Sequence, residues 1–245
     1  MPDKKDDPRE RLIIALDTSS MDDALRSVDL LGGSARWFKV GSQLFTSCGR
    51  DVVARIKSAG FKVFLDLKFH DIPATVSLAG ICAADIDVDI FNVHALGGWK
   101  MMKTTMDDVS AHCAKSGKPR PSIIAVTVLT SMTSADLNEI GVPDAPDKEV
   151  LRLARLAKAS GLDGVVASPL ETRLIREKVG DGFLIITPGV RPSWAGKDDQ
   201  SRVKTPAEAI KDGADHIVVG RPILKATNPA DAAKRVLDEI ASAMR

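Results

Sequence analysis

The sequence contains no tyrosine, and its aromatic residues are limited to seven phenylalanines and three tryptophans. Basic and acidic residues nearly balance, with 34 lysines and arginines against 33 aspartates and glutamates and a formal net charge of +1. Surfaces that bind nucleic acid combine a basic patch with aromatic side chains on which bases stack. The composition therefore argues against nucleic acid as a partner.

Cysteine and long apolar runs are scarce as well. The three cysteines, Cys48, Cys82 and Cys113, are odd in number and widely spaced, which disfavours a disulfide framework and a cysteine-rich zinc site. No apolar run approaches the roughly 18 residues that a membrane span requires. The first twelve residues lack the apolar stretch of a secretory signal, and residues 1–10 are expected to form a solvated, charged arm. We therefore expect a cytoplasmic protein without a membrane partner.

Metal-binding and nucleotide-binding motifs are also missing. No histidines, cysteines and carboxylates have the spacing of a zinc site; His70 and Asp71, for example, are adjacent rather than one helical turn apart. Neither a Walker-type loop nor a Gly-x-Gly-x-x-Gly loop occurs. The sequence thus predicts neither a metal nor a cofactor.

Short β-branched runs alternate with helical stretches along the whole chain. The expected strands are residues 12–17, 37–41, 62–69, 90–95, 122–129, 164–168, 183–187 and 216–220, and expected helices include 21–31, 43–59, 148–159, 207–212 and 229–244. Gly60, Gly161 and Gly213 suit the ends of helices that precede strands. Eight strand-helix units in 245 residues predict a single α/β domain, a (β/α)8 TIM barrel spanning residues 1–245, rather than an open sheet or two small domains.

The third expected strand carries charges where apolar residues would be usual. Asp66 and Lys68 share one face of this strand, and Leu65 and Leu67 share the other. A parallel strand covered by helices is normally apolar on both faces, so these charges cost free energy unless they are paired. Together with Asp71, they form either a structural ion-pair network or a catalytic group.

Polar residues follow most of the other strands too, and chemistry in TIM barrels gathers at the carboxyl ends of the strands. The residues in question are Asp17, Lys39, Asn92, His94, Thr130, Ser131, Arg191 and Arg221. Each has a structural alternative: Asp17 could cap a helix, Lys39 could extend along apolar surface to solvent, and His94 could be a hydrogen-bonded structural histidine. Their recurrence on one rim favours an active site.

The last two strand-helix units suggest phosphate binding. Gly220 and Arg221 offer an unobstructed backbone and a guanidinium group at a position where barrels often bind a phosphoryl group. The polar segment 190–202, with Gly196 in its middle, is either a flexible excursion or a lid that closes on a ligand. Its place after the seventh strand favours the lid.

These residues resemble the orotidine 5'-phosphate decarboxylase family, and the resemblance runs from Leu12 to near the C-terminus. The matching segments are 66–75 (DLKFHDIPAT), 128–131 (VLTS), 187–191 (TPGVR), 198–202 (DDQSR) and 219–221 (VGR). Related sugar-phosphate decarboxylases and synthases share the Asp-x-Lys-x-x-Asp core. The extended His-Asp-Ile-Pro-x-Thr and Asp-Asp-Gln-x-Arg segments distinguish this family from them.

The resemblance implies that the protein converts orotidine 5'-phosphate into uridine 5'-monophosphate and carbon dioxide, the final step of de novo pyrimidine biosynthesis. It implies a reaction without metal or cofactor, in a homodimer whose active sites are shared. The implied catalytic residues are Lys68 as proton donor to C6, Asp66 beside the departing carboxylate, Asp71 from the partner subunit, and Lys39. The implied substrate-binding residues are Asp17, Lys39, Asp66, Asp71, Ile72, Thr75, Thr130, Ser131, Pro188, Arg191, Gln200, Gly220 and Arg221.

Elementary chemistry agrees with the role that the resemblance implies for Lys68. Loss of carbon dioxide from an sp2 carbon leaves a localised, strongly basic carbanion, which a fixed ammonium group can stabilise and protonate. Two other functions stay open. The first is a metal-assisted barrel decarboxylase or aldolase acting on a sugar phosphate, against which Thr130, Ser131 and Gln200 argue. The second is a catalytically silent barrel that binds nucleotides.

Overall fold

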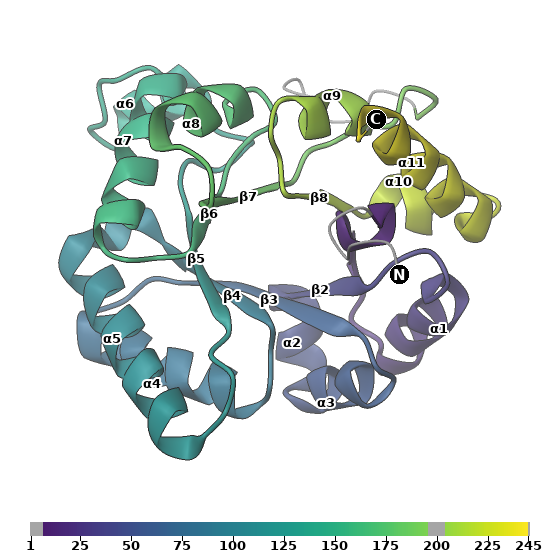
Figure 1. The fold of residues 1–245 in the computed structure, drawn as a ribbon, viewed down its shortest axis with the longest axis horizontal. Helices are drawn as coiled ribbons and strands as arrows, with labels where there is room; N and C mark the ends of the chain where they lie inside the picture. Colours follow the sequence, from purple (N-terminus) through teal and green to yellow (C-terminus); the bar gives the residue numbers. More distant parts are fainter. Residues whose placement is uncertain (1–6, 196–203, 245) are drawn as a thin grey trace.

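The eight strands form one closed barrel in the order of the sequence (Figure 1). The computed structural model describes residues 7–195 and 204–244. The strands are β1 (Leu12–Ala15), β2 (Trp37–Gly41), β3 (Lys62–Phe69), β4 (Ile90–His94), β5 (Ser122–Val126), β6 (Gly164–Val166), β7 (Leu184–Thr187) and β8 (His216–Val219). Every neighbouring pair is parallel, and β8 pairs with β1. The predicted (β/α)8 barrel is confirmed.

The helices lie outside the ring of strands (Figure 1). They are α1 (Met21–Leu31), α2 (Ser42–Cys48), α3 (Asp51–Ser58), α4 (Pro73–Asp85), α5 (Gly98–Ser116), α6 (Ser134–Glu139), α7 (Pro146–Ala159), α8 (Thr172–Val179), α9 (Pro206–Lys211), α10 (Arg221–Leu224) and α11 (Pro229–Ala243). Two short 3-10 helices, η2 (Pro8–Glu10) and η3 (Ala95–Gly97), precede β1 and α5. Within residues 7–195 and 204–244, no helix is both long and apolar enough to cross a lipid bilayer.

Glycines mark where several helices end. The expected helix over residues 43–59 is wrong as one element, because Gly49 with φ +62° separates α2 from α3. Gly60, Gly161 and Gly213 follow α3, α7 and α9 with φ values of +86°, +82° and +99°. Their predicted place at helix ends is confirmed, since a left-handed residue there turns the chain towards the next strand.

Two apolar layers hold the barrel together. The side chains inside the barrel come from all eight strands: Ile13, Ala15, Trp37, Phe64, Ile90, Ile124, Val126, Val166, Ile186 and Val218. A larger layer, which includes the fully buried Phe38 and Phe91, fills the space between strands and helices. Parallel strands between two such layers must be apolar on both faces, as the sequence of most of these strands is.

The segment before β1 closes the amino-terminal end of the barrel. Glu10 of η2 accepts hydrogen bonds from Trp37 Nε1 at 3.0 Å and from Lys62 Nζ at 2.9 Å. Lys62 Nζ also lies 4.7 Å from the centre of the Trp37 ring. The expectation of a solvated arm is therefore wrong at Glu10, because the buried indole N–H needs a polar partner. Residues 1–6 lie outside the described part of the chain.

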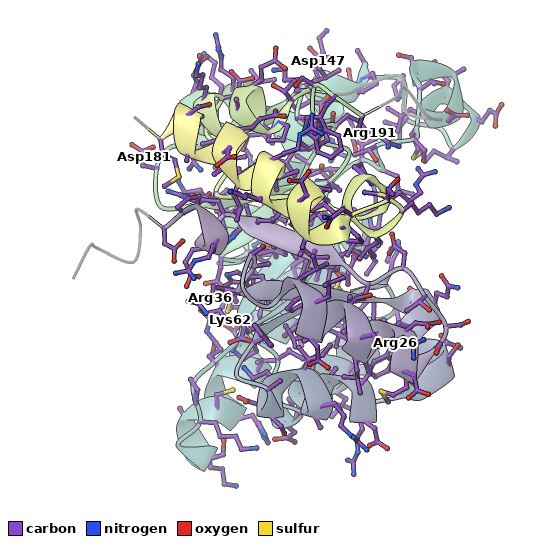
Figure 2. The ribbon with its side chains drawn as sticks, turned by 90° about the vertical axis from the view of Figure 1, so that its right-hand side faces the viewer. Arg26, Arg36, Lys62, Asp147, Asp181 and Arg191 are labelled. Atoms are coloured by element: carbon purple, nitrogen blue, oxygen red, sulfur yellow. The ribbon has the colours of Figure 1, made fainter. Side chains whose placement is uncertain are left out.

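The two ends of the barrel differ in what they display. Arg36, Lys62 and Asp181, which precede or begin strands, lie towards the left in Figure 2. Arg191, which follows β7, lies further right. The residues predicted to act in chemistry follow the strands, so the fold gathers them at this second end.

We expect Gly164→Ala to destabilise the barrel. A Cβ on Gly164 would lie 2.5 Å from Leu184 Cβ and still closer to the Leu184 carbonyl oxygen, where β6 pairs with β7. Forcing atoms into such a position costs about 1 to 3 kcal/mol or more of unfolding free energy, measurable in urea. Gly33→Ala is the control, because no described heavy atom lies within 4 Å of a Cβ there. Equal stability of the two variants would contradict the close approach of β6 and β7.

Candidate active site

A cavity of about 270 Å³ opens at the carboxyl end of the barrel. Nine of the residues predicted for the site line it: Asp17, Lys39, Asp66, Lys68, Thr130, Pro188, Arg191, Gly220 and Arg221. They lie within or follow strands β1, β2, β3, β5, β7 and β8. Apolar side chains of the barrel interior, including Phe64, Val126 and Val218, form the base of the same cavity.

Charges of alternating sign run along one side of the cavity. Lys39 Nζ lies 3.6 Å from Asp17 Oδ1 and 3.2 Å from Asp66 Oδ2. Lys68 Nζ lies 2.7 Å from the other carboxylate oxygen of Asp66, Oδ1. We call Asp17, Lys39, Asp66 and Lys68 the charged array. Asp66 is its centre, because each of its oxygens faces one lysine.

The pKa of the Asp66 carboxyl group is lowered by this arrangement. Burial alone would raise that pKa, since a charged carboxylate loses its hydration in the protein. The charges of Lys39 and Lys68, together with hydrogen bonds from Lys68 and Asn92, outweigh burial. Asp66 is therefore ionised at neutral pH, beside the cavity.

The ladder between β3 and β4 is irregular next to the charged array. Leu65 is opposite Phe91, but the next pair is Phe69 and Val93. Residues 66–68 therefore face the single residue Asn92. Lys68 has φ +53°, a left-handed conformation that residues with a side chain seldom adopt.

Asn92 fills the gap in the ladder with its side chain. It is fully buried, its Oδ1 accepts a hydrogen bond from the Lys68 backbone N–H at 2.7 Å, and its Nδ2 donates to Asp66 Oδ1 at 2.7 Å. Asn92 was expected at the end of a strand, but not among the catalytic or substrate-binding residues. The sequence feature that indicates a role for Asn92 is a carboxamide side chain within the otherwise apolar residues of β4.

Two arginines, Arg191 and Arg221, line the same cavity. Arg191 is almost fully buried, and its backbone N–H donates to the Lys204 carbonyl at 2.9 Å. A Cβ on Gly220 would lie 3.0 Å from Asp17 Oδ2. The small residue at position 220 thus leaves room for the Asp17 side chain, and Arg221 and the charged array line one cavity.

Four other predicted residues of the described chain do not line the cavity: Asp71, Ile72, Thr75 and Ser131. All four are exposed, and Asp71 Oδ1 accepts a hydrogen bond from the Ile72 backbone N–H at 2.6 Å. Gln200, and with it most of the predicted lid, lies outside the described residues.

His94 is a hydrogen-bonded structural histidine, which was one of the two roles predicted for it. Its Nδ1 accepts from the Leu96 backbone N–H at 3.4 Å, and its ring stacks on that of His70 with 5.3 Å between ring centres. Burial, followed by the nearby charges of His70 and Lys68, lowers the pKa of His94 to about 4. In the described part of the chain, no three side chains of His, Cys, Asp or Glu group closely enough to hold a metal ion.

Comparisons with known proteins agree on one family. A sequence model described as "Orotidine 5'-phosphate decarboxylase / HUMPS family" matches residues 10–236. The chain is 49% identical to orotidine 5'-phosphate decarboxylase of Geotalea daltonii, over 96% of this chain and 98% of that protein. It is also 49% identical to the protein of the same name from Geobacter sulfurreducens, over 96% and 98% of the two chains. The solved structure of orotidine 5'-phosphate decarboxylase from Lactobacillus acidophilus is similar with a TM-score of 0.82 and 38% identity, over 94% of this chain and 99% of that chain.

We expect Lys39→Met to raise the pKa of the Asp66 carboxyl group, because it removes an opposite charge 3.2 Å away and leaves the burial. A carboxyl group with a lowered pKa stabilises the fold above its unfolded pKa, and this stabilisation disappears as the pH falls through the folded value. The variant should lose it at a higher pH than the wild type.

Carboxyl 13C NMR titration measures the change directly, with Asp66→Asn assigning the signal. Lys57→Met is the matched control, because it removes an ion pair with Asp89 at 2.8 Å, before β4 at the other end of the barrel. An Asp66 titration that moves equally in both variants would rule out Lys39 as its specific partner.

Proposed function

The chain belongs to the orotidine 5'-phosphate decarboxylase / HUMPS family, and from this membership we propose that it decarboxylates orotidine 5'-phosphate to uridine 5'-monophosphate in pyrimidine biosynthesis. One observation carries the proposal. The charged array and the guanidinium groups of Arg191 and Arg221 line the same cavity. Orotidine 5'-phosphate carries a carboxylate on its base and a phosphate on its ribose, so the charged array could act on the first group while the two arginines bind the second.

In the proposed reaction, the bond between C6 and the carboxylate carbon breaks and its electron pair stays on C6. Lys68 Nζ then gives a proton to C6, carbon dioxide leaves, and the lysine regains a proton from solvent. Preorganised charge stabilises the developing carbanion most when it is fixed before the reaction begins. The 2.7 Å contact with Asp66 supports this role, because it fixes the end of the Lys68 side chain.

Asp66 is proposed to lie beside the substrate carboxylate. Its lowered pKa keeps it ionised, so the two carboxylates would repel each other in the bound substrate. The repulsion would disappear when the substrate carboxylate leaves as neutral carbon dioxide. Ground-state destabilisation of the bound substrate would therefore act between Asp66 and the substrate carboxylate. Asp17 and Lys39 would hold the ribose hydroxyl groups, and Thr130 and Ser131 the pyrimidine edge.

The proposed chemistry uses neither a metal nor a cofactor. Lys39 and Lys68 supply the positive charge that a metal ion would supply in a metal-assisted barrel. Arg191, Gly220 and Arg221 would bind the phosphate, far from the bond that breaks. Binding energy at this distance can organise the site, so substrates without phosphate would lose turnover as well as affinity.

A homodimer with shared active sites is part of the proposal. Asp71 and Thr75 are exposed near the start of α4 and outside the cavity of their own chain, which fits donation of Asp71, Ile72 and Thr75 to the partner subunit's site. Exposed apolar side chains on or next to the packed helices α4 and α5 also support a protein partner: Ile72, Leu78, Leu96 and Trp99. We further propose that residues 1–245 act as one barrel domain in the cytoplasm.

The decisive experiment follows the absorbance of orotidine 5'-phosphate with purified protein in excess EDTA. We expect EDTA-resistant loss of substrate, and a decrease in kcat on the order of 100- to 10,000-fold in Lys68→Ala, because the proton donor is missing. Lys62→Ala is the control, since Lys62 begins the same strand at the other end of the barrel and pairs with Glu10. No loss of orotidine 5'-phosphate with folded protein would instead favour a metal-assisted sugar-phosphate enzyme, to be tested next with a sugar phosphate and added magnesium.

Mixing two inactive variants tests the shared sites. Lys68→Ala and Asp71→Ala homodimers should each be inactive, but a hybrid dimer contains one site with both residues intact. If subunits exchange, as mass spectrometry of isotope-labelled chains can show, up to about half of the sites in a hybrid regain activity. Exchange without any recovery would mean that Asp71 acts within its own chain.

A further inference from the structure

We propose that Asn92 is a positioning residue, which holds Lys68 and Asp66 in their relative places through the two ends of its carboxamide. The inference rests on the proposed function for its catalytic consequence. Its structural basis is the gap in the ladder between β3 and β4, where one residue of β4 faces three of β3. Asn92 is fully buried there.

The first end of the carboxamide acts on the backbone of Lys68. Only Lys68 and Asp87 among the described non-glycine residues have positive φ. A left-handed conformation costs about 1 to 2 kcal/mol for such a residue and persists only where the surroundings enforce it. Asn92 Oδ1 accepts the Lys68 N–H at 2.7 Å, at the point where the irregular ladder lacks a regular pair. The side chain of β4 thus replaces a main-chain partner.

The second end acts on Asp66. Asn92 Nδ2 donates to Asp66 Oδ1, the same oxygen that faces Lys68 Nζ, and both distances are 2.7 Å. Asp66 Oδ1 is therefore held between the carboxamide and the ammonium group. A carboxamide has one acceptor end and one donor end, and these two contacts fix which end points to which residue.

If Asn92 positions its neighbours, residue 92 must supply one hydrogen-bond donor and one acceptor. If Asn92 only fills space, any side chain of the same shape should serve. Aspartate has nearly the same shape as asparagine but only acceptors when ionised, so Asn92→Asp would place a second carboxylate against Asp66. When protonated, its C=O can accept from Lys68 N–H and its O–H can donate to Asp66, which restores the original pattern. The two carboxyl groups would share one proton more readily as the pH falls.

The experiment measures kcat and KM for orotidine 5'-phosphate, and the Kd of uridine 5'-monophosphate, from about pH 8 to about pH 5, a range in which a carboxyl pair can take up a proton. In Asn92→Ala we expect kcat to fall on the order of 10- to 100-fold at every pH, with Kd within about threefold of the wild type, because the phosphate side is untouched. In Asn92→Asp we expect the same loss at about pH 8 and recovery of kcat relative to the wild type as the pH falls.

Thr105→Val is the matched control. Thr105 is fully buried in α5 and its hydroxyl donates to the Met101 carbonyl at 2.9 Å, away from the cavity. This variant should lose stability without a change in kcat. Wild-type kcat in folded Asn92→Ala, or an Asn92→Asp profile parallel to that of the wild type, would overturn the proposal. If Asn92→Ala does not fold, the nearly isosteric Asn92→Asp decides the question alone.

A readout without turnover separates this inference from the proposed function. Absence of turnover in the wild type at any pH would refute the function. The positioning role is then decided by the 13C titration of Asp66, which should move to higher pH in Asn92→Ala and stay in place in Thr105→Val. An unmoved titration in Asn92→Ala would refute the positioning role, whatever the substrate.

Discussion

Asp66 lies between Lys39 and Lys68, and the pairing of its two oxygens with these two ammonium groups is the interaction on which the rest of the site depends. An unpaired carboxylate in this mostly buried position would cost several kcal/mol. Each lysine, in turn, is held by a carboxylate that the barrel fixes in place. Asn92 adds a neutral third contact, so the pair keeps its geometry without a further charge.

The barrel supplies the precision that this pairing needs. Lys39 lies on β2 and Asp66 on β3, and the two strands are paired directly, with Gly41 opposite Asp66. Beneath them the apolar interior excludes water, and Glu10 with Trp37 and Lys62 closes the far end. The charges at the carboxyl end therefore lie next to an apolar interior of low dielectric constant, which strengthens the attraction between opposite charges.

Much of this arrangement could be predicted from the sequence, because the alternation of strands with helices and the polar residues at strand ends are visible in short stretches of sequence. The barrel and all eight strands follow from the alternation of β-branched runs with helical stretches, and the shared face of Asp66 and Lys68 follows from their spacing. The division of residues 43–59 depends on the conformation of Gly49, and the role of Glu10 depends on the distant Trp37. The contacts of Asn92 could not be predicted for the same reason: its partners are 24 and 26 residues away, across a ladder irregularity that no local pattern reveals.

The closed ring has a consequence for synthesis of the chain on the ribosome. Asp17 follows the first strand and Arg221 follows the last, yet both line one cavity because β8 pairs with β1. A nascent chain that ends before β8 has two unpaired edges, on β1 and on β7, and such edges readily join other chains. The site can be completed only after Arg221 has been made. Until then, the growing chain is exposed to aggregation at these edges, and chaperones that shield unpaired strands would act during this interval.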